Sequence, residues 1–136
     1  MLNVATYLDR STVHGIGLFA AQEIEPGAVV WEFNPSVDLA YTLDQWQALK
    51  ASVSFHSFAN LRRLSFKENG QIYLCLDNAQ FMNHSETNDN VAHVLSKDKM
   101  EAVRKISKGE ELLCNYLSYS DPDDFHIRNI GDKILK

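Results

Sequence analysis

Turn signals divide the apolar stretches of this chain about every ten residues, and this spacing limits the possible folds more than any other feature. Short apolar runs between such turns are typical of a mainly β domain with short helices. The pattern is clear in "GLFAAQEIEPGAVVWEF", which predicts strands at 18–23 and 28–33 joined by a turn at 25–27. Proline presets φ at such a turn, and glycine supplies a positive φ.

Two helical segments and four further strands are predicted along the rest of the chain. A helix is expected at 43–52, because Thr42 and Gln45 can form a capping box at its start. Its apolar side chains fall near one face: Leu43, Trp46, Leu49 and Val53. Segment 55–66 is ambiguous, but its apolar spacing also favours a helical piece: Phe55, Phe58, Leu61 and Leu64. The strands are expected at 71–76, 91–95, 101–106 and 111–114, with turns at Asn69-Gly70 and Lys108-Gly109.

The length of the chain, 136 residues, is enough for one domain but not for two. No repeat or linker divides the sequence, so we expect a single domain at 1–120. Few apolar side chains anchor the tail at 121–136, which is expected to be flexible or to cover a cofactor. No run approaches the roughly 18 apolar residues of a membrane span, so no membrane partner is expected.

The charge distribution bears on possible partners. The net charge is −5, and acidic residues gather at Asp121, Asp123 and Asp124, whereas the basic residues are dispersed. Nucleic-acid-binding proteins usually present a basic face, so direct nucleic-acid binding is not expected. An acidic surface is compatible with a basic protein partner, and the acidic stretch near the C-terminus is a candidate for attracting it.

Side chains that form metal sites and disulfides are sparse and scattered. The five histidines show no two-ligand spacing, so no metal site is predicted. Two cysteines, Cys75 and Cys114, are too few for a disulfide scaffold and are expected to be buried thiols. The N-terminal stretch lacks the layout of a secretion signal. The expected location is therefore the cytoplasm, with the nucleus or secretion into a host left open.

The stretch "HGIGLFA" contains a G-x-G-x-x-A string formed by Gly15, Gly17 and Ala20. A dinucleotide-binding fingerprint of this kind must open a helix of a dozen residues or so. The turn at Pro26-Gly27 follows too soon for such a helix, so a short strand fits better. Two interpretations remain: a simple turn with positive φ, or a backbone loop that lies close to a ligand.

The stretch "FMNHSETNDN" places the apolar pair Phe81-Met82 directly before Asn83, His84 and Ser85. The pair is expected to be buried, which would draw the polar side chains toward the core. Buried polar groups are costly unless each finds a hydrogen-bond partner. The pattern therefore indicates a specific polar cluster at the edge of the core.

Taken in order, four motifs resemble the SET domain, the fold of protein-lysine methyltransferases that use S-adenosyl-L-methionine: "GIGLFA", "VVWEF", "CLDNAQFMNHS" and "GEELLCNY". The resemblance covers residues 10–120 and is greatest to small free-standing bacterial members. It implies several small twisted sheets and a C-terminal segment threaded, pseudoknot-like, through a loop. It also implies methyl transfer to a lysine of a basic protein, for which histone-like and ribosomal proteins are candidates.

The resemblance also assigns roles to single residues. The backbone of Gly15, Ile16 and Gly17 matches the glycine turn beside the methionine part of the cofactor. Asn83 and His84 match the pair that holds the amino-acid and adenine ends of the cofactor, and the threaded segment brings them against Tyr116. Tyr116 matches the catalytic tyrosine next to the transferred methyl group, so it is also a cofactor contact. One further expectation is stacking of the cofactor on a tail aromatic, Phe125.

The expected substrate channel departs from the family pattern. Phe33 stands where relatives often carry a tyrosine, so Tyr41 or Tyr73 can replace it, although each also fits an ordinary half-buried aromatic. Cys114 stands where many relatives carry Phe or Tyr, so the number of methyl groups added is left open. These departures favour, as alternatives, a cofactor-binding interaction module without turnover or a β domain without a cofactor. The chain is expected to be a monomer or a homodimer.

Overall fold

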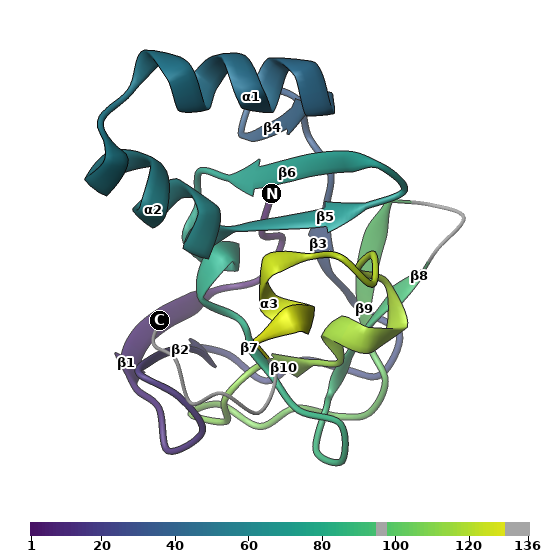
Figure 1. Ribbon diagram of the computed structural model, residues 1–136. Coiled ribbons are helices and arrows are strands. Elements are labelled where there is room, and N and C mark those ends of the chain that lie inside the picture. The colour runs from purple at the N-terminus through teal and green to yellow at the C-terminus, as the bar shows by residue number, and fades with distance from the viewer. Residues whose placement is uncertain (95–97, 130–136) are drawn as a thin grey trace.

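The computed structural model describes residues 1–94 and 98–129 and shows a mainly β fold with short helices (Figure 1). The strands are β1 (Thr6–Arg10), β2 (Ile16–Ala20), β3 (Val29–Glu32), β4 (Asp38–Tyr41), β5 (Ser65–Glu68), β6 (Gln71–Cys75), β7 (Asn83–His84), β8 (Val91–Val94), β9 (Lys99–Ala102) and β10 (Leu113–Cys114). The α-helices are α1 (Leu43–Ser52), α2 (Phe55–Leu64) and α3 (Phe125–Arg128), and two 3₁₀ turns are η1 (Asn78–Phe81) and η2 (Tyr116–Ser118). The predicted fold class is confirmed.

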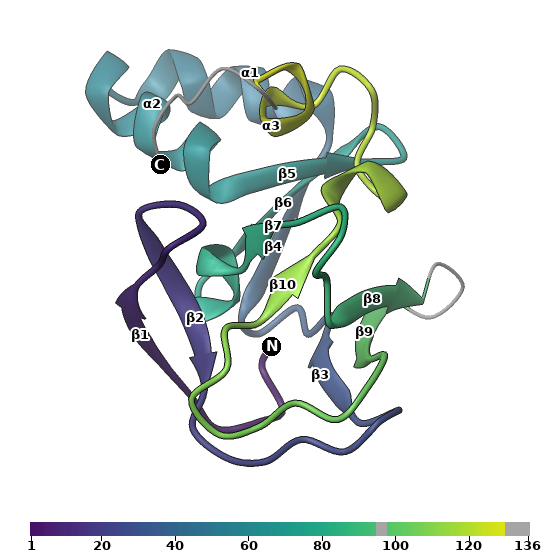
Figure 2. The same ribbon diagram turned by 90° about the horizontal axis from the view of Figure 1, so that it is seen from below.

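A five-stranded sheet in the order β3-β9-β8-β10-β7 carries the central topological feature. The short strand β10 runs parallel to both of its neighbours, with Leu113 opposite Asn83 and Cys114 opposite both His84 and Val91. Residues 85–90 connect those two neighbours, so the C-terminal part of the chain passes between the ends of this connection (Figure 2). The predicted threading is therefore present, and it sets Asn83 and His84 directly beside the strand that leads to Tyr116.

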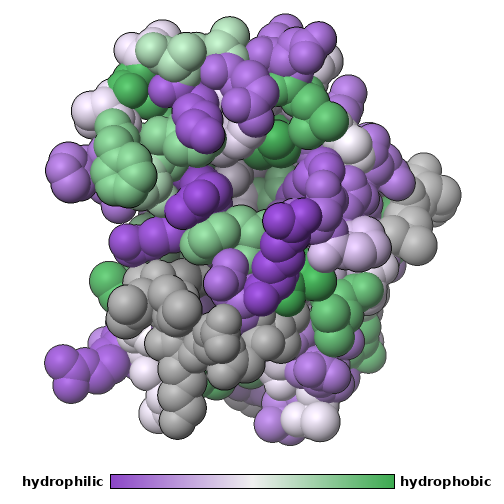
Figure 3. All heavy atoms as spheres, viewed as in Figure 1, coloured by the Kyte–Doolittle hydropathy of each residue, from purple (hydrophilic) through white to green (hydrophobic). Residues whose placement is uncertain are grey.

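Two smaller sheets surround this centre. The hairpin of β1 and β2 pairs Thr6 with Ala20 and Arg10 with Ile16. The other sheet has the order β4-β6-β5, and α1 and α2 lie together along it (Figure 1). Trp46 anchors α1 through ring contacts at 5.4 Å to Tyr41 and 5.3 Å to Phe58. On the face shown in Figure 3, polar and apolar side chains are interspersed.

The helix predicted at 43–52 has these bounds, and its Thr42–Gln45 capping box is present. The apolar face is narrower than predicted, because Trp46 is buried whereas Leu43 is 47% exposed. The second helical piece is α2, but Phe55 at its start is 82% exposed and does not face the core. In both helices, therefore, fewer apolar side chains are buried than the spacing of apolar residues in the sequence indicates.

The first and last residues of some strands differ from the predictions, because pairing with a neighbouring strand decides where a strand begins and ends. The strand predicted at 101–106 lies at Lys99–Ala102, because both of its neighbours pair with it as far as Lys99. Ile106 instead forms an isolated bridge with Ile24. The strands β1, β4 and β5 were not predicted, since their exposed and buried side chains do not alternate regularly. The turn at Asn69-Gly70 is present, with positive φ at both residues.

The core lies between the five-stranded sheet and the β1–β2 hairpin. Its buried members are Leu18, Ala20, Ile24, Val30, Trp31, Cys75, Met82, Val91, Met100, Ala102, Ile106, Leu112, Cys114 and Tyr116. Both cysteines are free and buried, as predicted. Among the described residues, no helix combines the length and apolar character needed to cross a membrane.

Candidate functional site

Asn83 connects the glycine turn to the threaded segment. Its side chain is 1% exposed, and Nδ2 donates to the backbone oxygens of His14 (2.9 Å) and Ile16 (3.2 Å) and to Glu111 Oε1 (3.0 Å). All three partners are acceptors, which fixes the amide nitrogen as the group that faces them. The amide oxygen, Oδ1, is buried without a hydrogen-bond partner among the described residues. A buried acceptor of this kind is a candidate contact for a ligand that carries N–H groups.

Glu111 explains why position 17 must be glycine. Its carboxylate accepts hydrogen bonds from Asn83 Nδ2 and from Ser11 Oγ (3.0 Å), so it lies under the turn. A Cβ atom added to Gly17 would overlap Glu111 Oε1. Of the two interpretations of the glycine string, close approach therefore applies at Gly17, and the group that approaches is the chain's own carboxylate. Gly15 has a φ of 50°, so it also meets the requirement of a turn.

We predict that Gly17→Ala lowers the free energy of unfolding by about 1–3 kcal/mol, because Glu111 must move and leave Asn83 and Ser11. Chemical denaturation measures this change. In a Glu111→Ala background the same substitution should cost much less, since the overlapping atoms are gone. An equal cost in both backgrounds would contradict this account. Gly27→Ala, where φ is 81° and a Cβ meets no atom within 4 Å, measures for comparison the cost of backbone strain without an overlap.

His84 and Tyr116 lie against each other at the end of the threaded segment. Their ring centroids are 5.0 Å apart, and the backbone N–H of Tyr116 donates to His84 Nδ1 (3.0 Å). Because Nδ1 accepts, the proton of a neutral His84 is on Nε2. The Tyr116 side chain is 8% exposed, and its hydroxyl donates to the backbone oxygen of Met82 (2.6 Å). Burial holds the pKa of Tyr116 well above 10, so the phenol is neutral.

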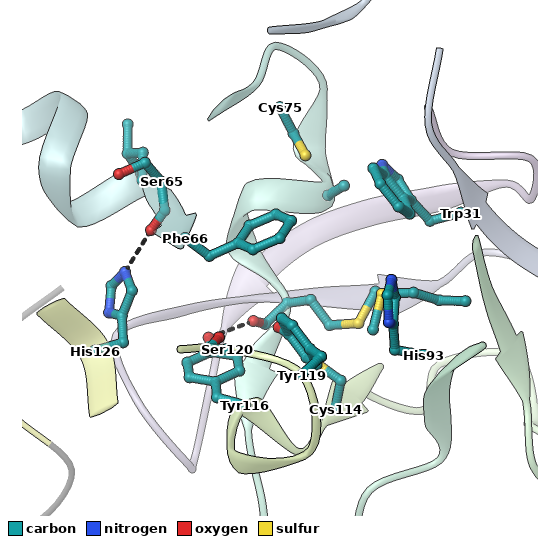
Figure 4. Close-up of a pocket in the computed structure, with 14 residues that line it drawn as sticks. Trp31, Ser65, Phe66, Cys75, His93, Cys114, Tyr116, Tyr119, Ser120 and His126 are labelled. Carbon is teal, nitrogen blue, oxygen red and sulfur yellow. Dashed lines mark hydrogen bonds between the residues drawn. The ribbon is translucent and has the colours of Figure 1, made fainter. Parts of the chain in front are cut away.

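The Tyr116 ring forms part of the wall of an apolar pocket of about 60 Å³. Figure 4 shows Trp31 and His93 on one side of this pocket and His126 and Ser65 on the other. The pocket is lined by Trp31, Leu64, Ser65, Phe66, Cys75, Ala79, Met82, His93, Met100, Cys114, Tyr116, Tyr119, Ser120 and His126. A water molecule needs roughly 10–15 Å³ by the same measure, so there is room for a larger group.

Only one of the four predicted channel residues lines this pocket. Cys114 does, and its Sγ atom is 3.6 Å from the Tyr119 hydroxyl. Phe33 and Tyr73 contact each other at 5.9 Å, and Tyr73 stacks at 5.2 Å on the pocket residue Phe66, so both stand behind the wall. Tyr41 packs against Trp46 under α1 instead of the pocket. The residue type and its position in a motif do not show whether a side chain lines the pocket or lies behind the residues that line it.

The tail residue Phe125 lies away from the cluster of Asn83, His84 and Tyr116. It lines a separate groove, and the Arg62 guanidinium sits over its ring at 4.5 Å. The neighbouring residue His126 lines the pocket instead: its ring is 5.7 Å from that of Tyr116, and Nε2 is 3.0 Å from the Ser65 backbone oxygen.

Acidic side chains hold the described part of the tail against the turn between β5 and β6. Asp121 accepts hydrogen bonds from the backbone N–H groups of Asn69 (2.7 Å) and Gly70 (2.9 Å). Asp124 accepts from the N–H of Lys67 (2.5 Å), and Asp123 pairs with the Lys67 ammonium (2.6 Å). Fewer carboxylates of this stretch are therefore free to attract a basic partner than the sequence indicates. Residues 130–136 of the predicted tail lie outside the described residues.

The SET domain family matches residues 15–117 of this chain. The chain belongs to the SET domain family. The match extends from the glycine turn to the end of the threaded segment, so it includes Asn83, His84 and Tyr116. Known relatives and solved structures agree with this assignment.

The chain is 29% identical over 139 residues to histone-lysine N-methyltransferase 2D of Homo sapiens, and the match covers 88% of this SET chain. The chain spans about 2% of the length of that relative. Among solved structures, the Neurospora SET domain protein DIM-5, a histone lysine methyltransferase, matches with a TM-score of 0.57 and 18% identity over 85% of this chain and 53% of that one. A Polycomb Repressive Complex 2 of Chaetomium thermophilum, bound to S-adenosylmethionine, matches with a TM-score of 0.60 and 24% identity over 93% and 17% of the two chains.

Several pocket residues of this SET domain were not predicted. Trp31 lies within the motif "VVWEF", and Tyr119 follows Tyr116 by three residues. Their positions in or near the motifs could therefore have indicated both. Phe66 and His93 lie on strands of two hairpins, opposite Tyr73 and Met100. The two hairpins belong to different sheets, and the sequence does not show which face of each strand turns toward the pocket.

Proposed function

We propose that this SET domain is an S-adenosyl-L-methionine-dependent protein-lysine N-methyltransferase that acts on a basic protein. The observation that supports it most is the joint placement of a buried, neutral Tyr116 phenol and the Asn83–His84 pair around the end of the threaded segment. A basic substrate agrees with the net charge of −5 and with the activity named for the histone-lysine relative. The resemblance to small bacterial members stays an expectation.

The residues around the glycine turn fit the proposed cofactor. The cofactor carries an ammonium group at its amino-acid end, and Asn83 Oδ1 is a buried acceptor beside the turn. An open depression of about 430 Å³ adjoins the same turn and is lined by Leu8, Asp9, Arg10, Gly15 and Ile16. Asn83, His84 and the backbone of the turn are therefore the proposed cofactor contacts. When bound, S-adenosyl-L-methionine supplies a methyl group on a positively charged sulfur.

The chain's own residues would prepare the acceptor amine. A free lysine has a pKa of about 10.4, so almost all of it is charged and unreactive near pH 7. The apolar wall around Tyr116 disfavours the charged form and so lowers the pKa of a lysine that enters. The Tyr116 phenol is neutral, so it orients groups through hydrogen bonds and does not act as a base at this pH. Orientation and exclusion of water then supply most of the acceleration.

Two measurements on the full chain test this proposal. S-Adenosyl-L-methionine at about 100 times its dissociation constant should stabilise the fold by about 2.7 kcal/mol, which a thermal shift detects. Radiolabelled methyl groups should then pass to lysines in a panel of histone and ribosomal proteins, located by mass spectrometry. Cofactor binding without transfer to any lysine would contradict the proposed activity.

A second candidate function is a cofactor-binding interaction module without turnover. It is favoured by Phe33, which stands behind the pocket wall, and by Cys114, which places a small thiol in the wall where many relatives carry a larger aromatic ring. Calorimetric cofactor binding combined with neither self-methylation nor substrate methylation would favour this alternative. Light scattering determines whether the chain is a monomer or a homodimer.

A further inference from the structure

One residue of the tail, Asp121, holds the tail against the edge strand β5. This strand is the last of its three-stranded sheet, so the outer side of its backbone has no neighbouring strand. The Asp121 N–H donates to the Lys67 backbone oxygen (2.7 Å) on that side. The Asp121 carboxylate accepts the N–H groups of Asn69 (2.7 Å) and Gly70 (2.9 Å) in the turn that follows. These three hydrogen bonds fix the start of the tail to the turn between β5 and β6.

The position of Asp121 matters for the pocket, because residues on both sides of it in the sequence line the pocket. Tyr119 and Ser120 come directly before Asp121, and His126 follows it by five residues. Figure 4 shows His126 beside Ser65, whose backbone oxygen is 3.0 Å from His126 Nε2. Release of Asp121 from the turn would free the backbone that carries these side chains. The contacts of Asp121 therefore stabilise this part of the pocket wall.

Glu68 is a buried carboxyl group at the start of the same turn. It is 8% exposed, although glutamate is rarely buried without a cation beside it. Its Oε1 atom is 3.5 Å from His93 Nδ1, but burial lowers the pKa of His93, so the imidazole is neutral. Two lysines of the surrounding strands are already paired: Lys67 on β5 with a carboxylate of the tail (2.6 Å), and Lys99 on β9 with Glu101 (2.8 Å). A negative charge on Glu68 is therefore poorly compensated.

Two further carboxylates lie near Glu68. Asp121 binds the two N–H groups that directly follow Glu68, and Asp98 directly precedes β9. Burial, and then the charges of Asp98 and Asp121, raise the pKa of Glu68 to about 7. Burial also raises the pKa values of the neighbouring phenols of Tyr73 and Tyr119, so both are neutral. Glu68 is therefore mostly protonated below pH 7 and ionised above it.

We propose that Glu68 is a pH-sensitive switch that controls how tightly Asp121 holds the tail against β5. When Glu68 is protonated, the Asp121 carboxylate stays on the turn and the tail completes the pocket wall. When Glu68 is ionised, it repels the Asp121 carboxylate and requires water, so the tail leaves the turn more often. The switch is a property of the chain alone, and its effect on methyl transfer rests on the proposed function.

Folding stability should change with pH in the same direction. Folding raises the pKa of Glu68 from 4.5 to about 7, so the folded chain binds this proton more tightly than the unfolded chain does. The stability that Glu68 contributes is then complete at low pH and is lost as the pH rises through about 7. His93 has a lowered pKa and acts in the opposite direction, since it costs stability below about pH 6.5. A Glu68→Gln variant keeps the His93 effect, so its difference from the parent chain isolates Glu68.

The test measures how often the turn loses Asp121 in the full chain, without cofactor or substrate. NMR gives the hydrogen-exchange rates of the Asn69 and Gly70 amides at about pH 5.5 and about pH 8.5. Protection is the rate of an unstructured chain at the same pH divided by the measured rate, so the ordinary acceleration of exchange with pH cancels. We expect the protection of both amides to fall about five- to tenfold at the higher pH, which corresponds to about one pKa unit of coupling between Glu68 and Asp121.

One amide and two variants serve as controls. The Ser107 N–H is also held by a carboxylate in a turn, that of Glu110 (3.0 Å), and its protection should not change with pH. Glu68→Gln should keep nearly equal protection of Asn69 and Gly70 at both pH values. The matched variant Glu25→Gln removes a carboxylate from an exposed turn and should retain the pH dependence of the parent chain.

Two results would overturn the switch: protection of Asn69 and Gly70 in the parent chain that does not depend on pH, or a pH dependence that Glu68→Gln retains in full. The first result needs no variant, so a failure of Glu68→Gln to fold leaves the test intact.

A methylation assay keeps the switch distinct from the proposed function. If the protection of Asn69 and Gly70 falls as expected but no lysine is methylated, the proposed function fails and the switch stands. If lysines are methylated but the protection is independent of pH, the switch fails and the proposed function stands.

Discussion

Replacing Tyr116 by phenylalanine should lower kcat for methyl transfer by about 100-fold or more, which is the usual loss when one well-placed hydrogen-bond donor is removed. The Tyr116 hydroxyl is buried, neutral and directed to the backbone oxygen of Met82 at 2.6 Å. Its removal leaves that oxygen without its donor and costs about 1–2 kcal/mol of stability, which the fold should survive. Steady-state kinetics with the protein substrate measure the loss of kcat, and a thermal melt measures the loss of stability.

The matched control is Tyr119→Phe. Tyr119 is also a tyrosine of the pocket wall, but the partner of its hydroxyl among the described residues is the weak one Cys114 Sγ, at 3.6 Å. We expect its kcat to fall by less than about fivefold, since a thiol contact contributes little. Equal losses in the two variants would mean that Tyr116 shapes the pocket without a role in the reaction. Unchanged turnover in Tyr116→Phe would move the catalytic role to another residue.

Replacing Asn83 by alanine should abolish stabilisation by S-adenosyl-L-methionine and lower the free energy of unfolding by about 2–4 kcal/mol. The amide of Asn83 joins the backbone oxygens of His14 and Ile16 to the Glu111 carboxylate. Without it, three partly buried acceptors lose a shared donor, and the glycine turn loses its link to the threaded segment. Denaturant unfolding and a cofactor thermal shift measure the two effects separately.

Asn90→Ala provides the control for Asn83→Ala. Asn90 is equally buried, and its side chain donates to the Glu111 backbone oxygen (2.8 Å) and accepts from the Leu113 N–H (2.9 Å). Its loss should destabilise the fold by a similar amount while the folded fraction still binds the cofactor. A cofactor shift retained in Asn83→Ala, or lost equally in both variants, would contradict the assignment of Asn83 to the cofactor.

The sequence predicts those features whose cause is local. The capping box of Thr42 and Gln45 fixes the start of α1, because both hydrogen bonds form within one turn. The Asn69-Gly70 turn is predictable for the same reason, since few other residues adopt positive φ at both positions. The motif set also placed Asn83, His84 and Tyr116 near one another, although no local rule brings residues 32 positions apart into contact.

Features that depend on distant partners could not be predicted. The Glu111 carboxylate makes position 17 a glycine, yet nothing between these positions in the sequence indicates their contact. The Glu68–His93 pair joins β5 to β8, two strands of different sheets. The acidic run at 121–124 was interpreted as a solvent-facing surface, but Asp121 and Asp124 bind backbone N–H groups. A carboxylate in a sequence does not reveal whether water or a buried N–H group will be its partner.

The most direct test of the central claim is a crystal structure of the chain with S-adenosylhomocysteine, the demethylated form of the proposed cofactor. The account predicts that its amino group lies within hydrogen-bond distance of Asn83 Oδ1, with its sulfur directed toward the Tyr116 side of the pocket. A molecule bound instead in the groove beside Arg62 and Phe125, with Asn83 Oδ1 still unpaired, would contradict it.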